Sequence, residues 1–444
     1  MKLYTFRKGG IHPGNYKLTA DAPIKTAEIP AQVAIPLSQH TGTPAQPVVQ
    51  KGDRVKVGTL LASAGEGISA PVHSSVSGKV NRFDMQMDTS GYKRPVVVID
   101  VEGDKWEEAI DTSSTLIKEY RLTAEEILQK IEQAGIVGMG GAAFPIHIKL
   151  KPPKGAKAEV LLINGAECEP YLTADYRIMI EKSEELIVGV ELLMKASGAN
   201  KAFIAIEDNK PAAIKKLREL TRNNPFIEIA ALKTKYPQGG EKQLICAVLH
   251  KRIRSGALPI SVGAIVQNAG TAIAVYEAVQ KNKPSIERIV TVTGKELKKG
   301  GNYLVRIGTP FQHLIDLAGG IPEGTGKIIS GGPMMGKAVY DTSVVVTKGT
   351  SGIVLLPGKE SARKKAAECI RCAKCLEVCA MRLNPSRLMT LSEFKEWDKA
   401  EKEMIADCIE CGSCSYICPA TRPLLDYIRL GKRTVINNTR NRRK

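Results

Sequence analysis

The apolar and polar positions along the chain follow different periods in successive segments. Between residues 36 and 101, short apolar runs alternate with glycine-containing turns, which is typical of an all-β unit. Between about residues 115 and 286, short apolar runs alternate with helical stretches, and this order predicts an α/β fold with a largely parallel sheet. The strands expected there are residues 159–164, 202–207 and 226–232, and the expected helices are residues 175–196 and 211–223.

Local signals predict further elements. Thr123 and Glu126 have the spacing of a capping box, so they predict a helix that starts there and ends at Gly135. A strand, a helix and a returning strand of a β-grasp unit are expected at residues 290–294, 311–318 and 342–357. Residues 359–365 are then expected to open a helical domain.

These segments predict a multidomain α/β protein. The expected domains, in chain order, are an extended arm (1–35), a carrier-like β domain (36–102), an α/β domain (115–286), a β-grasp domain (287–357), a helical domain (359–430) and a basic tail (431–444). The β domain looks like the flattened barrel-sandwich hybrid of lipoyl and biotinyl carriers. Such carriers need a lysine at the tip of one hairpin, and the corresponding turn, Ala64–Gly67, has none. A docking or scaffold role is therefore expected for this domain.

Composition places the chain among ordinary globular proteins, with 444 residues of which 43% are hydrophobic. No apolar run reaches the roughly 20 residues that a membrane-spanning helix needs, so a soluble or peripheral protein is expected. The net charge of +18 is compatible with an acidic protein partner or an anionic lipid surface. Nucleic acid is not expected as a partner, because aromatic residues make up only 5% and the basic residues are dispersed.

The C-terminal part carries two copies of one cysteine motif. The spacing C-x2-C-x2-C-x3-C occurs at Cys369, Cys372, Cys375 and Cys379, and again at Cys408, Cys411, Cys414 and Cys418. This spacing is typical of proteins with two [4Fe–4S] clusters, in which the fourth cysteine of each run binds the other cluster. We therefore expect one cluster to be bound by Cys369, Cys372, Cys375 and Cys418, and the other by Cys408, Cys411, Cys414 and Cys379.

Zinc and disulfides are the other common uses of clustered cysteines. Structural zinc usually takes four ligands from two C-x2-C pairs and has no need of a third cysteine in each run. Disulfides are disfavoured because the chain opens without a secretory signal. Cys168 and Cys246 lie outside the motif and are expected to be buried, unreactive thiols.

A second chemical motif is the glycine-rich segment Gly138–Pro145, which is followed by Lys149. Glycines let backbone N–H groups approach a phosphate closely, and a nearby lysine adds a positive charge. A tight turn without a ligand is the alternative interpretation. The segment is neither a Walker loop nor a Rossmann fingerprint, because no Gly-Lys-Ser/Thr follows it and no strand precedes it.

A polar turn, Asn164–Pro170, follows the first expected strand of the α/β domain. Ligand sites in α/β sheets lie at the carboxyl ends of strands. Glu167 and Glu169 in this turn are either solvated turn residues or acceptors for the amide and ribose of a nucleotide. Because the turn comes after the glycine-rich segment, we favour the nucleotide interpretation.

The order of these motifs resembles that in the FMN-bearing, NADH-oxidising subunit of respiratory complex I. The shared segments are the glycine-rich segment, the Asn164–Pro170 turn, Tyr236–Glu241 and Gln267–Thr271, followed by the β-grasp unit. The opening Gly9–Pro13 segment, the carrier-like barrel and the twin cysteine motif are absent from that subunit. Together they match the C subunit of the Rnf complex, the membrane ferredoxin:NAD+ oxidoreductase, to about residue 430.

The resemblance implies roles for individual residues. FMN and NAD(H) would be bound by Gly138, Gly140, Gly141, Lys149, Asn164, Glu241, Asn268 and Thr271, with Lys149 near the FMN phosphate. Phe144 would stack on the nucleotide, and Glu167, Glu169 and Glu241 would surround the nicotinamide. Met139, Ala166 and Gly240 depart from the complex I pattern, which has arginine at the first position and acids at the other two. These departures reduce the polar contacts available to the nucleotides.

By the same resemblance, the protein is expected to be an oxidoreductase subunit of an ion-transporting complex. It would pass electrons between NAD(H), FMN and two [4Fe–4S] clusters, while other subunits transport Na+ or H+. Its partners would be the other Rnf membrane and ferredoxin-like subunits, and it would lie peripherally on the cytoplasmic face of a bacterial or archaeal cell membrane. Two alternatives remain: a soluble flavin and iron–sulfur cobalamin reductase of the same architecture, and a non-catalytic electron wire or scaffold.

Overall fold

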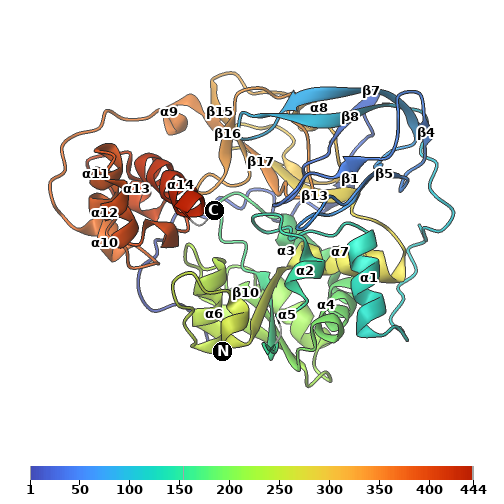
Figure 1. Ribbon diagram of the computed structural model, residues 1–444, viewed down its shortest axis with the longest axis horizontal. Helices are drawn as coiled ribbons and strands as arrows, with labels where there is room; N and C mark the ends of the chain where they lie inside the picture. Colours follow the sequence, from blue (N-terminus) through green and yellow to red (C-terminus); the bar gives the residue numbers. More distant parts are fainter. Residues whose placement is uncertain (1, 154, 443–444) are drawn as a thin grey trace.

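The computed structural model of the protein describes residues 2–153 and 155–442. Figure 1 shows the N-terminal β domain (blue) beside the β-grasp domain (orange), with the α/β domain (green) below them. The helical cysteine domain (red) lies at one side of these three. The multidomain α/β class expected from the sequence is therefore confirmed.

The N-terminal β domain consists of two small antiparallel sheets. One contains β2 (Gln32–Pro36), β8 (Lys93–Val101), β7 (Gly78–Met87) and β4 (Arg54–Val55) in that order, and the other contains β3 (Gln46–Pro47), β5 (Leu60–Ser63) and β6 (Val72–His73). Ile35, Leu61 and Ile99 are fully buried between the sheets. β2 begins before residue 36, where the domain was expected to start.

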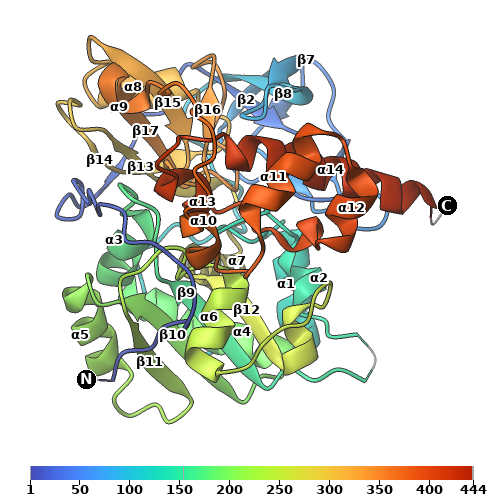
Figure 2. The same cartoon turned by 90° about the vertical axis from the view of Figure 1, so that its left-hand side faces the viewer.

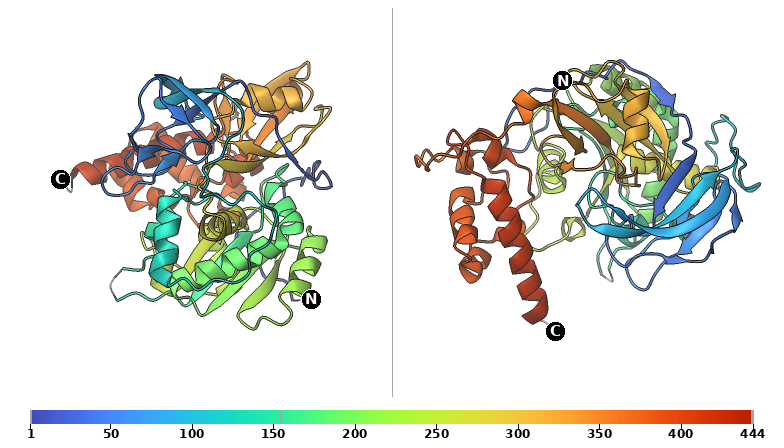
Figure 3. Two further views of the ribbon diagram at one scale, coloured as in Figure 1. Left: turned by 90° about the vertical axis from the view of Figure 1, so that its right-hand side faces the viewer. Right: turned by 90° about the horizontal axis from the view of Figure 1, so that it is seen from above.

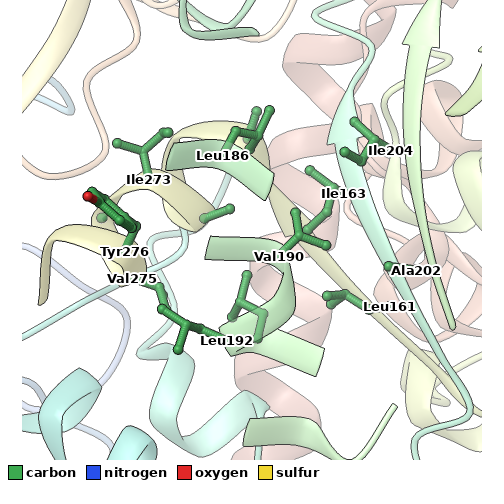
Figure 4. Packing of buried hydrophobic residues seen from close by; sticks show 14 of the residues in the cluster. Leu161, Ile163, Leu186, Val190, Leu192, Ala202, Ile204, Ile273, Val275 and Tyr276 are labelled. Carbon is green, nitrogen blue, oxygen red and sulfur yellow. The ribbon is translucent and has the colours of Figure 1, made fainter. Parts of the chain in front are cut away.

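The α/β domain is built on a parallel sheet in the order β11-β10-β9-β12. The strands are β9 (Val160–Gly165), β10 (Lys201–Glu207), β11 (Ile227–Leu232) and β12 (Ala264–Asn268). On one face lie α4 (Ser183–Ser197) and α7 (Ala269–Gln280), and Figure 4 shows Leu161 and Ile163 of β9 beside Val190 and Leu192 of α4. Helix α6 (Glu241–Leu249) covers the opposite face, and η1 (Pro259–Val262) leads into β12.

The three helices expected in this domain are present, one of them divided in two, whereas α2 (Ile146–Lys149), α6 and α7 were not expected. Helix α1 (Ala124–Gln133) starts at Thr123 with both bonds of the capping box, and Gly135 has a positive φ of 63° just beyond its end. Helices α2 and α5 (Pro211–Leu220) are short. The single helix expected at 175–196 is two helices, α3 (Ala174–Glu181) and α4, because Lys182 between them, with φ −119° and ψ 39°, lies outside the helical region.

The β-grasp domain contains a sheet in the order β1-β14-β13-β17-β15-β16. Its strands are β1 (Ile24–Thr26), β13 (Glu287–Thr293), β14 (Gly301–Arg306), β15 (Thr325–Ser330), β16 (Lys337–Val339) and β17 (Gly352–Pro357), and α8 (Phe311–Leu317) packs on it. The strand expected at 342–357 was predicted too long. A turn from Thr347 to Thr350, closed by three hydrogen bonds, precedes β17.

The same turn buries a lysine where three domains meet. The Lys348 side chain is completely buried, and its Nζ atom donates hydrogen bonds to the carbonyl oxygens of Pro71 (2.9 Å) and Gly135 (2.7 Å). Its backbone N–H donates to the Gln39 side chain at 3.1 Å. Burial lowers the pKa of Lys348 from 10.5 to about 7. This residue therefore links the carrier-like, α/β and β-grasp domains.

The cysteine domain is helical. It contains α10 (Lys374–Glu377), α11 (Pro385–Glu393), α12 (Trp397–Lys402), η2 (Ile405–Asp407), α13 (Ser413–Ile417) and α14 (Leu424–Arg442). Helices α11 and α14 cross closely, since a Cβ atom added at Gly431 would lie 2.1 Å from the Ser392 hydroxyl. The described part of the segment expected as a basic tail belongs to α14, which Figure 3 shows projecting from the body of the protein. Buried Ile428 and Val435 explain why the helix continues.

The helical start expected at residues 359–365 was wrong in its position. Helix α9 (Gly358–Ser361) is a single turn, and the next helix of the chain begins at Lys374. The intervening segment is exposed, and Arg371 and Ala373 have positive φ angles that a right-handed helix cannot contain.

The N-terminal arm runs over three domains, as its path in Figure 2 shows. Tyr4 pairs with Leu232 of β11, and Ile11 pairs with Tyr236. Further along, β1 joins the edge of the β-grasp sheet beside β14. Within the described residues, no helix combines the length and the apolar character needed to cross a bilayer.

Candidate functional site

Two asparagines lie at the point where the strand order of the parallel sheet reverses. The chain proceeds from β9 to β10 on one side and returns to β12 on the other, so the switch point lies between β9 and β12. Asn164 and Asn268 are paired across these strands at their carboxyl ends. Ligands of open α/β sheets bind at this kind of position.

The glycine-rich segment lies against this edge of the sheet as a closed loop. Gly138 donates its N–H to the Phe144 carbonyl at 2.9 Å, and Met139 donates its N–H to the Thr271 hydroxyl at 2.9 Å. Thr271 is fully buried, so it supports the loop from behind. A Cβ atom at Gly140 would lie 3.0 Å from the Asn268 side chain, whereas one at Gly141 would meet nothing.

The exposed rim of this loop offers unpaired donors. Among the described residues, the amide N–H groups of Gly140, Gly141 and Ala142 have no protein acceptor. Neighbouring free backbone amides are suitable donors for the oxygens of a phosphate. The loop therefore fits the phosphate group of FMN.

Both asparagines at the switch point already hold neighbouring loops. Asn164 accepts from Ala166 N–H (3.2 Å) and donates to the Gly239 carbonyl (2.8 Å). Asn268 accepts from Gly270 N–H (2.8 Å), which caps α7, and donates to Asp175 (2.6 Å). These bonds hold in place the surface between the glycine-rich loop and the loop that precedes α6, and we call this surface the floor of the site.

Lys149 and Glu241 form an ion pair at the side of the loop, with Nζ and Oε1 2.6 Å apart. Their side chains are partly exposed, so either group can exchange this partner for a ligand at small cost. The pair brings together the two charged residues that the resemblance assigned to FMN and the nicotinamide.

The two carboxylates of the polar turn bind backbone amides in different directions. Glu167 accepts from the N–H groups of Asp175 and Tyr176 at the start of α3. Glu169 accepts from Met334 N–H (3.0 Å) and Met335 N–H (2.7 Å), in the loop between β15 and β16. Phe144 lies half-buried at the closing end of the glycine-rich loop. Contact of these side chains with a nicotinamide stays a prediction.

Several charged residues around the site were not singled out from the sequence. Lys17 of the arm donates to the carbonyl oxygens of Glu167 (2.7 Å), Glu169 (2.9 Å) and Leu172 (2.6 Å), and burial lowers its pKa to about 8. Arg288 is buried in β13 and donates to the Met139 carbonyl at 3.3 Å. The sequence carried no clear signal for Arg288, because it follows Glu287 at the polar start of β13.

Asp175 is a further acid at the switch point that the sequence did not reveal. Removal from water and the neighbouring Glu167 carboxylate raise the pKa of Asp175 to about 6, while Arg288 and the Asn268 amide act in the opposite direction. Asp175 is the second residue of α3, so the sequence showed it only as a common helix-start residue.

The cysteines form two groups. Cys379, Cys408, Cys411 and Cys414 line one cavity, together with apolar side chains such as Leu388 and Ile428. Cys375 is close enough to both Cys369 and Cys418 for their charges to raise its pKa, after burial as the main cause. Cys379 thus lies with the second run of the motif and Cys418 with the first. Cys369 and Cys372 are exposed.

The donor set of each group fits an iron–sulfur cluster. Within residues 2–153 and 155–442, no three histidine, cysteine, aspartate or glutamate side chains converge as closely as a single metal ion requires. A cluster of four irons separates its thiolate ligands more widely than one ion does. Four thiolates are the ligand set of a [4Fe–4S] cluster, and Cys379, Cys408, Cys411 and Cys414 supply that set around one cavity.

The chain matches four described protein families in succession. Residues 4–104 match the RnfC barrel sandwich hybrid domain, and residues 131–277 match the Nuo51 FMN-binding domain. Residues 289–338 match the SLBB domain, and residues 368–421 match a 4Fe-4S dicluster domain. The order of these matches follows the order of the domains in the fold.

Curated relatives match over almost the entire chain. The C subunit of a proton-translocating ferredoxin:NAD(+) oxidoreductase complex from Clostridium ljungdahlii is 47% identical, covering 97% of this chain and 94% of that protein. The C subunit of a Na(+)-translocating ferredoxin:NAD(+) oxidoreductase complex from Acetobacterium woodii is 44% identical over 98% of both chains. The C subunit of an ion-translocating oxidoreductase complex from Rhodobacter capsulatus is 38% identical, covering 86% of this chain and 74% of that protein.

Among solved structures, a chain of the NAD+-reducing [NiFe]-hydrogenase in its H2-reduced state shares the fold with a TM-score of 0.50. The two are 18% identical, and the match covers 70% of this chain and 62% of the hydrogenase chain. At this level of identity the match concerns the fold alone.

Proposed function

This chain belongs to the RnfC family, the C subunits of ion-translocating ferredoxin:NAD+ oxidoreductase complexes, and from this premise we propose that it carries electrons between NAD(H), FMN and two [4Fe–4S] clusters. The observation that carries the proposal is a loop that links two sites. The loop that begins at Tyr236 accepts a hydrogen bond from Asn164 at the switch point, and Tyr236 itself bonds to the carbonyl of Cys411, which lines the cavity of Cys379, Cys408 and Cys414.

The residues of the chain would bind and orient the nucleotides. The amides of Gly140, Gly141 and Ala142 would bind the FMN phosphate, with Lys149 supplying positive charge beside Glu241. Asn164, Asn268 and Thr271 would hold the floor and the loop in position. When bound, FMN supplies the conversion between the two-electron chemistry of NAD(H) and the one-electron chemistry of iron–sulfur clusters.

Two residues that depart from the complex I pattern lie inside the protein. Met139 is 4% exposed and Ala166 is fully buried, so neither side chain reaches the solvent side of the loop. The free amides on that side are backbone groups, and these substitutions leave them in place. This favours a nucleotide-binding subunit over the alternative of a non-catalytic wire or scaffold.

The cysteine groups give the proposed electron path an order. The α/β domain touches the group of Cys379, Cys408, Cys411 and Cys414, through Tyr236 with Cys411 and through Gln243 with the carbonyl of Ala380. This cluster would exchange electrons with the flavin, and the cluster of Cys369, Cys372, Cys375 and Cys418 would lie further along the path. Exposure of Cys369 and Cys372 supports the second cluster as the point of exchange with a partner subunit.

The wider setting follows from the family. As a subunit of a complex, the chain has other subunits as partners. We propose that these are the membrane and ferredoxin-like subunits, that they transport Na+ or H+, and that this chain lies peripherally on the cytoplasmic face of the membrane. Its net charge of +18 would favour acidic protein surfaces and anionic lipids.

An anaerobic NADH titration tests the proposal. The full chain is reconstituted with iron and sulfide, FMN is added, and the flavin absorbance is followed with EPR of the clusters. Bleaching of the flavin by stoichiometric NADH, followed by reduced-cluster signals, is expected. If NADH leaves the flavin oxidised while dithionite still reduces the clusters, the chain is a wire or scaffold and the nicotinamide chemistry lies elsewhere.

A further inference from the structure

Tyr236 connects the α/β domain to the peptide that carries the second cysteine run. The residue follows β11 and is 1% exposed. Its hydroxyl group donates a hydrogen bond to the carbonyl oxygen of Cys411 at 2.8 Å. A buried phenol needs such a partner, and the bond ties the Cys411 backbone to the loop before α6.

Glu169 reaches the same peptide by a second route. Its carboxylate holds the amides of Met334 and Met335, and the Met334 carbonyl oxygen would lie 3.1 Å from a Cβ atom added at Gly412. The carboxylate therefore fastens the β15–β16 loop, which packs directly on the residue after Cys411.

Glycine is required where the β15–β16 loop meets Glu169. A Cβ atom at Gly332 would lie 2.2 Å from the Glu169 carboxylate. No side chain fits in that space, so the loop and the carboxylate are in direct contact. This fit points to a built junction between the polar turn of the α/β domain and the β-grasp domain.

The N-terminal arm closes the junction from a third side. Gly10 donates its N–H to the Val378 carbonyl at 2.8 Å, and a Cβ atom at Gly9 would lie 2.7 Å from the Cys379 carbonyl oxygen. Gly9 has a φ of 80°, which favours glycine. The opening Gly9–Pro13 segment of the sequence, to which no nucleotide role was given, thus packs on a predicted cluster ligand.

We propose that Tyr236 and Glu169 are positioning residues that hold the Cys379–Cys408–Cys411–Cys414 cluster beside the flavin site, so that they control electron transfer between flavin and cluster without contacting the nicotinamide. The inference rests on the proposed function. It also gives Glu169 a role different from the nicotinamide contact implied by the family resemblance. If either contact is lost, the peptide that carries the cluster ligands moves more freely and the flavin–cluster distance can increase. Electron transfer slows steeply as that distance grows.

Two conservative variants test the assignment in the full chain with clusters and FMN reconstituted. Tyr236→Phe removes the hydroxyl that donates to the Cys411 carbonyl. Glu169→Gln weakens the hydrogen bonds that the side chain accepts from the N–H groups of Met334 and Met335. After mixing with NADH, flavin bleaching is followed by stopped flow and cluster reduction by freeze-quench EPR. We expect bleaching at the rate of the unmodified protein and a reduced-cluster signal that appears several-fold more slowly, because the flavin and the cluster are held less closely together.

Two comparison variants separate a positioning role from other roles. Tyr340→Phe alters a fully exposed tyrosine and should leave both phases unchanged. Glu167→Gln alters the neighbouring carboxylate, which binds the start of α3 instead of the β15–β16 loop. If Glu169→Gln raises the KM for NADH and slows flavin bleaching, the residue faces the nicotinamide and the positioning assignment is wrong.

Hydrogen exchange of the peptide around Cys411 and Gly412 gives a readout that needs no NADH chemistry. We expect faster exchange there in Tyr236→Phe and Glu169→Gln, with iron content and melting temperature close to those of the unmodified protein. Unchanged exchange in both variants would overturn the positioning role. If the flavin bound to the unmodified protein does not bleach with NADH, the proposed function is wrong. The hydrogen-exchange result still decides the positioning role in that case.

Discussion

Asn164 and Asn268 lie opposite each other where β9 and β12 end, and each uses both atoms of its amide to hold a different loop. Asn164 fixes the loop before α6, and Asn268 fixes the start of α7 and the Asp175 carboxylate. The side-chain amides of these two residues therefore fix the loops around the switch point before a ligand binds. A preformed floor lowers the entropic cost of binding a nucleotide.

The Asn268→Ala variant should be less stable than the unmodified protein. It loses the helix cap on Gly270 N–H and leaves the Asp175 carboxylate without its amide donor. Loss of a helix cap costs about 0.5–2 kcal/mol, so the melting temperature should fall by a few degrees. Circular dichroism would measure this, with Asn15→Ala as control, because the exposed Asn15 side chain forms no hydrogen bond within the described residues. An equal melting temperature in Asn268→Ala would show that neither bond contributes.

Two alanine substitutions in the glycine-rich loop should have different effects. The Gly141→Ala methyl group meets no protein atom, so stability should stay unchanged while FMN affinity falls about tenfold through contact with the phosphate. The Gly140→Ala methyl group lies 3.0 Å from Asn268, so this variant should lose both stability and FMN affinity. Flavin fluorescence titration and thermal unfolding measure the two properties. Full FMN affinity in Gly141→Ala would place the phosphate elsewhere.

The grouping of the cysteines predicts which cluster each variant damages. Cys379→Ala should damage the cluster bound mainly by the second run, because Cys379 shares a cavity with Cys408, Cys411 and Cys414. Cys418→Ala should damage the other cluster, whose ligand Cys375 is near Cys418. EPR of the dithionite-reduced variants measures which signal is lost. Cys246→Ala is a matched control outside the motif, and loss of the opposite signals would refute the crossed ligation.

Lys348 should make stability depend on pH. Its pKa is 10.5 in the unfolded chain and about 7 in the fold, so between these values the unfolded chain binds one proton more. The free energy of unfolding should therefore rise with pH across this window, by about 1.4 kcal/mol per pH unit from this group. Lys348→Met should lose that part of the slope, whereas exposed Lys364→Met should keep it. Urea unfolding at several pH values would measure both, and parallel slopes in all three proteins would contradict the assignment.

The sequence predicted those features that depend on neighbouring residues. The capping box of Thr123 and Glu126 is local, and the strands of the α/β domain are short apolar runs whose period is visible in the chain. The family resemblance supplied the nucleotide residues, and of these the structure brings the glycine-rich loop, Lys149, Glu241 and the two asparagines to one end of the sheet.

The features that were missed depend on residues far apart in the chain. In the sequence, Lys348 is a polar residue within the strand expected at 342–357. Only the carbonyl groups of Pro71 and Gly135, which accept its hydrogen bonds, explain why its side chain is buried. Likewise, nothing local shows that Glu169 binds amides of the β-grasp domain. The extent of α14 was also hidden, because its basic residues outnumber the few apolar positions that bury it.

The N-terminal arm has a consequence for how the protein is made. Tyr4, Gly10 and β1 are synthesised first, yet they bond to Ala231, Val378 and β14, which leave the ribosome much later. The arm must stay unpaired while most of the chain is translated, and its contacts close long loops that form slowly. Docking of the arm on Cys379 can then follow only after the cysteine domain exists. Assembly of the clusters and closure of the arm are thus late, neighbouring events in the maturation of the protein.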